Sequence, residues 1–143
     1  MSLRAIFGLV ISAFWVFFLI LAGCKDSSSS NEQDQDIYPD SMLSYSRHIR
    51  PIFLEDCAMP GGCHHSSVRE GGLDLESDPP DFQGDHGLVV IPFSSTGSLL
   101  YQLLFNDVSG ISRMPPPNYS SYLSDPKIKA IGTWIDEGAN PSN

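Results

Sequence analysis

The chain has 143 residues and a formal net charge of −9, with 8 basic side chains against 17 acidic ones. The length fits one small domain. The acidic balance argues against a nucleic-acid partner, because phosphate binding needs clustered Lys and Arg. The sequence also lacks a Gly-x-Ser-x-Gly elbow, a phosphate-binding loop and a recognisable frame of paired carboxylates. We therefore predict a protein that is not an enzyme.

The first 23 residues follow the plan of a secretory signal, with Arg4 before an apolar run over 5–21 and small residues after it. Residues 21–24, LAGC, resemble the lipobox of bacterial lipoproteins, which implies cleavage before Cys24 and acylation of that cysteine. Loss of Arg4 moves the net charge from −9 to −10. The alternative is an uncleaved transmembrane anchor, since about 19 apolar residues nearly span a bilayer.

A polar segment over residues 24–43 contains four consecutive serines, amides and acids, which is typical of a flexible tether. The folded domain is expected over residues 44–140. We expect a lipid-anchored protein of the cell envelope, on the periplasmic or outer-membrane face. The remaining cysteines, Cys57 and Cys63, would then lie in an oxidising compartment, where free thiols rarely persist.

Apolar periodicity and capping residues predict three helices in this domain. They run from residue 46 or 50 to Asp56 with Ser46 as a possible cap, from Ser98 to Phe105 with Thr96 or Ser98 as cap, and from Asp125 to Glu137 between Ser124 and Gly138.

Residues 66–95 have little periodicity and many Gly and Pro residues, which predicts a long loop. Short extended pieces are expected at 73–75 and 88–91. A core made only of this chain's side chains looks thin in this region, so the loop is expected to wrap a ligand.

The segment CAMPGGCHH over residues 57–65 brings together two thiols and two imidazoles. Covalent haem attachment normally uses C-x-x-C-H, whereas the spacing here is C-x5-C-H. Pro60, Gly61 and Gly62 can loop out the additional residues.

Two other interpretations of this segment remain open. Cys57 and Cys63 could form a disulfide in an exported lipoprotein domain that binds a protein or a surface polymer without haem. A compact zinc or copper site could combine the two cysteines with His64 and His65, although structural zinc usually takes ligands from two separated pairs.

The order of the parts resembles class I c-type cytochromes, in particular the planctomycete-type cytochrome c domains. The matching pieces are IRPIF at 49–53, GGLDL at 71–75, SLLY at 98–101, MPP at 114–116 and the stretch 123–139. The resemblance implies an all-α fold of three main helices with long loops wrapped on one covalent haem c, and one-electron transfer between redox partner proteins.

The resemblance also implies roles for single residues. Cys57 and Cys63 would form the haem thioethers, His64 would be the proximal axial ligand and Met114 the distal one. His65 or His86 is the alternative distal ligand. Trp134 is expected to pack against the first helix. Apolar residues would pack on the haem or behind it, namely Ile52, Phe53, Leu73, Leu99, Leu103, Trp134 and Ile135.

Overall fold

The structure is a computed structural model and describes residues 37–117, 119 and 122–143. The predicted export signal, Cys24 and most of the predicted tether lie outside the described residues. No helix within the described ranges is both long enough and apolar enough to cross a membrane.

The first helix is continuous from Tyr45 to Cys57 and consists of η1 (Tyr45–Ile49), α3 (Arg50–Ile52) and η2 (Phe53–Cys57). The turns of η1 and η2 are wider than α-helical turns, so the Ala58 N–H reaches the Phe53 carbonyl at 2.7 Å. Pro51 is the second residue of α3 and lies within this continuous helix, where it has no N–H to donate to the preceding turn. The bounds agree with the predicted helix, but the cap is Ser44, whose Oγ accepts from the Arg47 N–H at 3.3 Å.

The other helices are η3 (Glu70–Gly72), α4 (Leu99–Gln102) and α5 (Asp125–Asp136). Helix α4 is shorter than predicted, because the chain turns away after Gln102. Helix α5 matches the prediction closely and ends before Gly138, which has φ +108°.

An antiparallel hairpin of β1 (Gln83–Gly84) and β2 (Gly87–Leu88) lies in the region predicted to be loop, with Gln83 opposite Leu88. The structure is 31% helical and combines helices with this two-stranded sheet, so the prediction of an all-α fold is wrong. The Gly- and Pro-rich sequence cannot form a helix here. Its backbone groups pair across the hairpin instead, as the Val89 N–H does with the Phe82 carbonyl at 3.0 Å.

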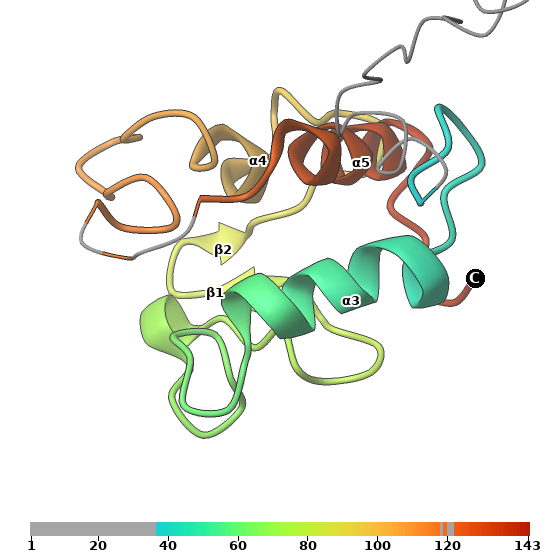
Figure 1. The fold of residues 1–143 in the computed structure, drawn as a ribbon. Coiled ribbons are helices and arrows are strands. Elements are labelled where there is room, and N and C mark those ends of the chain that lie inside the picture. The colour runs from blue at the N-terminus through green and yellow to red at the C-terminus, as the bar shows by residue number, and fades with distance from the viewer. Residues whose placement is uncertain (1–36, 118, 120–121) are drawn as a thin grey trace, which may run out of the picture.

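Helix α5 lies alongside the first helix (Figure 1). Four buried rings pack against one another, namely those of Tyr45, Phe53, Phe82 and Trp134. The Trp134 ring centroid lies 5.6 Å from that of Tyr45, 6.4 Å from that of Phe53 and 5.7 Å from that of Phe82. Its Nε1–H donates to the Asn140 carbonyl at 3.2 Å. The predicted packing of Trp134 against the first helix is confirmed.

The region 66–95 contributes more to the core than predicted. It buries five apolar side chains, namely Leu73, Leu75, Phe82, Val89 and Val90. The expectation that this loop lacks a core of its own was therefore wrong, because its apolar residues are buried without helical periodicity.

Candidate functional site

The loop between the two cysteines contains a tight turn over residues 59–62. The Gly62 N–H donates to the Met59 carbonyl at 2.6 Å, Pro60 occupies the second position, and Gly61 has φ +78°. This is the residue pattern of a type II turn, which needs positive φ at its third position. The chain then returns, and the His64 N–H donates to the Cys57 carbonyl at 3.1 Å. The turn thus accommodates the additional residues of the C-x5-C-H motif.

Two cavities meet beside this loop. The larger has a volume of about 230 Å³ and the smaller about 40 Å³, and both are lined by Cys57, His64, Leu104 and Met114. Cys63 lines the smaller cavity. The rest of the larger cavity's lining is mostly apolar: Phe53, Leu73, Leu75, Val89, Leu99, Leu100, Leu103, Ile111 and Ile131, with Glu70, Gly71 and His86. The structure therefore brings the four predicted site residues together.

His64 presents an imidazole suited to binding a metal. Its Nδ1 is buried and has no hydrogen-bond partner among the described residues. Burial lowers the pKa of His64, and the Leu73 and Glu70 carbonyls oppose this only in part. The lowered pKa favours the neutral ring, which is the form that ligates metals.

Cys57 and Cys63 are both free thiols. Burial raises the pKa of Cys57 to about 12, and the nearby Asp56 charge acts in the same direction. Cys63 lies near the rim, where its Sγ is 3.9 Å from the Tyr119 hydroxyl.

Met114 is fixed by its backbone. Its N–H donates to the Leu103 carbonyl at 2.7 Å, directly after α4, and the Met114–Pro115 peptide bond is cis. The preceding N–H, of Arg113, donates to an Asp107 carboxylate oxygen at 2.8 Å. These contacts hold the 105–117 loop against α4 with Met114 at the cavity wall.

The other histidines of the predicted site have different surroundings. His65 pairs with Glu76, with 3.2 Å between Nε2 and Oε1, and its Nδ1 lies 2.8 Å from the Ser67 Oγ. His86 lines the larger cavity, as His64 does. In the part of the chain that the structure describes, no three His, Cys, Asp or Glu side chains form a metal-binding group. The donor set of the zinc or copper alternative is therefore not assembled.

Sequence reasoning missed two features of the site. Leu104 lines both cavities, although the predicted helix gave no reason to distinguish it from Leu103. Asp56 lines the smaller cavity and pairs with Lys127 at 2.6 Å. Asp56 and Lys127 are 71 positions apart in the sequence, so no local pattern predicted this pair.

Residues 61–118 match the family model described as Planctomycete cytochrome C. Searches among curated proteins and solved structures gave no match. The matched residues include Cys63, His64 and Met114 but begin after Cys57. The match supports a cytochrome c-like domain, and at the level of that family it implies covalently bound haem and electron transfer.

The residues of the site fit such a cofactor. The cavities offer a buried imidazole, a thioether sulfur and two free thiols, which are the groups that hold haem covalently and ligate its iron. The surrounding walls are largely apolar, as a porphyrin requires.

Proposed function

We propose that this protein is a one-electron carrier with a single haem held by Cys57, Cys63, His64 and Met114. The observation that supports this most is the meeting of Cys57, His64 and Met114 at the walls of the same two cavities, although Met114 lies far from the other two in the sequence. The bound haem would supply a reversible one-electron couple, and imidazole–thioether ligation favours the reduced state.

The chain itself would fix the position of the Met114 thioether and exclude water from the cavities. The backbone of Met114, which carries the thioether, is fixed in two ways. Its N–H donates to the Leu103 carbonyl, and the prolines that follow restrict the chain. Leu103 and Leu104 are buried beside it and exclude solvent. A site that changes little on gaining or losing an electron suits a carrier rather than a catalyst.

We place this carrier on a lipid anchor at Cys24, in the cell envelope, from which the polar tether would let it meet redox partner proteins. The lipobox-like LAGC and the polar residues after it support this proposal. Metabolic labelling with a radioactive or clickable fatty acid tests it. Label should appear in the full chain and be lost in Cys24→Ser, whereas label retained in that variant would contradict the anchor.

The haem is tested by expressing the full chain in cells that carry haem-attachment machinery, followed by a pyridine haemochrome spectrum and an intact mass. We expect the mass of the chain plus one haem. Cys57→Ser and Cys63→Ser should each leave one vinyl group unsaturated and shift the haemochrome band. A mass equal to that of the bare oxidised chain would instead indicate a disulfide and no haem.

The distal ligand is tested by Met114→Ala. The weak near-infrared band of sulfur-ligated ferric haem should disappear and the potential should fall. Met42→Ala is the matched control, because that side chain is 88% exposed and lines neither cavity of the site. A band that persists in Met114→Ala would remove this residue from the site.

A further inference from the structure

One ion pair adjoins the site. The Lys127 Nζ lies 2.6 Å from Oδ2 of Asp56 and 3.4 Å from Oε2 of Glu55. Asp56 directly precedes Cys57 and lines the smaller cavity. The side chains of Lys127 and Asp56 are only 23% and 19% exposed, whereas that of Glu55 is 68% exposed.

The charge of Asp56 bears on any redox centre in that cavity. An anion close to haem favours the oxidised form, which carries one more positive charge, and so lowers the reduction potential. Water screens such an effect weakly at a half-buried wall. A cation within hydrogen-bond distance of the carboxylate cancels most of it.

Lys127 is well placed to be that cation. It lies in the first turns of α5, which brings its ammonium group to the end of η2. Burial acts to lower the pKa of Lys127, but the Asp56 and Glu55 carboxylates outweigh it, and the pKa is raised. The lysine therefore keeps its charge across the physiological range.

We propose that Lys127 raises the reduction potential of the site by neutralising Asp56 on the cavity wall. This inference rests on the proposed function, because it requires haem beside Cys57. It adds a residue on α5, which supplies none of the four residues proposed to hold the haem, and gives the pair an electrostatic role as well as a structural one.

The same helix offers a matched control. Lys129 pairs with Asp40 at the same distance, 2.6 Å, but these side chains are 65% and 78% exposed. Neither residue lines a cavity of the site. Lys129→Met removes a lysine charge from α5 without changing the charge at the cavity wall.

The experiment is a potentiometric titration of the haem-loaded full chain and its variants. Lys127→Met should lower the midpoint potential, Asp56→Asn should raise it, and the double variant should return close to the wild-type value. Lys127→Arg should leave the potential nearly unchanged because it keeps the charge, and Lys129→Met should do so because its charge is remote and screened.

The opposite signs of the two single variants separate charge from packing. A pair that only fastened α5 to the first helix would, when broken from either side, admit water and shift both potentials in one direction. That outcome, or unmoved potentials in haem-loaded variants, overturns the inference alone. A wild-type chain without haem would refute the proposed function and the inference together.

Discussion

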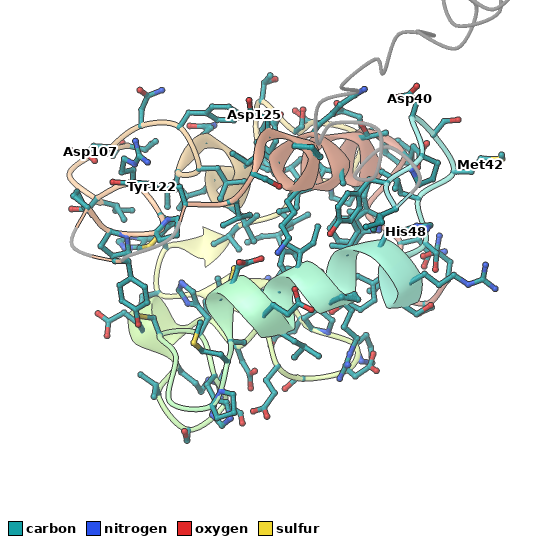
Figure 2. The ribbon with its side chains drawn as sticks, in the orientation of Figure 1. Asp40, Met42, His48, Asp107, Tyr122 and Asp125 are labelled. Atoms are coloured by element: carbon teal, nitrogen blue, oxygen red, sulfur yellow. The ribbon has the colours of Figure 1, made fainter. Side chains whose placement is uncertain are left out.

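The two ends of the first helix differ in what fills the space beside them. Near its start, Tyr45 packs on Trp134, and the core is closed by the chain's own aromatic rings. At its end, Cys57 borders cavities whose walls are mostly apolar. Figure 2 labels Met42 and His48 near the first end, and Asp107 and Tyr122 on the loops toward the second. The first end is packed by buried aromatic rings, and the second borders the cavities of the proposed site.

The largest loss of stability should follow removal of the indole at the filled end. Trp134→Ala should lower the free energy of unfolding by about 3–5 kcal/mol, because it deletes a side chain that is 1% exposed. Urea unfolding followed by circular dichroism measures the loss, with Met42→Ala as the surface control. A similar loss in both variants would contradict the assignment of the core.

At the hollow end, truncation of Leu104 should depend on the cofactor. Without haem, Leu104→Ala should cost about 2 kcal/mol, the low end for such a substitution, because part of the side chain already faces empty space. With haem bound, the same change removes contacts and should cost more. Unfolding of the two forms gives the comparison, and equal losses would place the haem away from Leu104.

The turn within the C-x5-C-H loop should tolerate change at one glycine but not at the next. A Cβ at Gly62 would lie 2.9 Å from the Met59 carbonyl oxygen, so Gly62→Ala should cost about 1–2 kcal/mol and reduce haem attachment. Gly61 has open space around it, and Asn accepts positive φ. Gly61→Asn should therefore cost less than Gly62→Ala, and haem content per chain distinguishes the two variants.

The smallest effect concerns the carboxylate of Asp74, which lines neither cavity of the site. Burial acts to raise the pKa of Asp74, but hydrogen bonds from Ser77 and the Glu76 N–H lower it overall. A lowered pKa means that the carboxylate stabilises the fold above its unfolded pKa, and that this stability is lost as the pH falls through the folded pKa. Asp74→Asn should cost about 1 kcal/mol near pH 6 and progressively less toward pH 3. Urea unfolding at both pH values tests this, and a constant difference would contradict it.

The filled end was the more predictable from sequence. The spacing of apolar residues, with Ser124 before the helix and Gly138 after it, predicted α5 and the burial of Trp134 correctly. Such a prediction works because buried residues recur every three or four positions in a helix. The same reasoning failed for Phe82 and Val89, whose burial depends on a hairpin with no repeating pattern. That failure also produced the incorrect all-α prediction.

At the end of the first helix near Cys57, sequence periodicity predicted little of the structure. The meeting of Met114 with Cys57 came from a family resemblance, since nothing in the spacing of distant residues fixes their contact. Local chemistry did indicate how Pro60 and Gly61 would turn the chain. No sequence motif and no periodicity predicted the Lys127–Asp56 pair.

The hydrogen bonds at residues 42–46 have a mechanical consequence. The Glu137 carboxylate accepts from the Leu43 N–H at 2.8 Å, and the Asn143 Oδ1 accepts from the Tyr45 N–H at 2.6 Å. A force transmitted along the chain ahead of Ile37 would reach the exposed Asp40–Lys129 pair and then these bonds, and would pass into α5 and the segment after it. Cys57 lies about 20 Å further along the helix. Tension on the chain would thus be shared with the C-terminal segment before it entered the first helix, and less of it would reach the groups around His64.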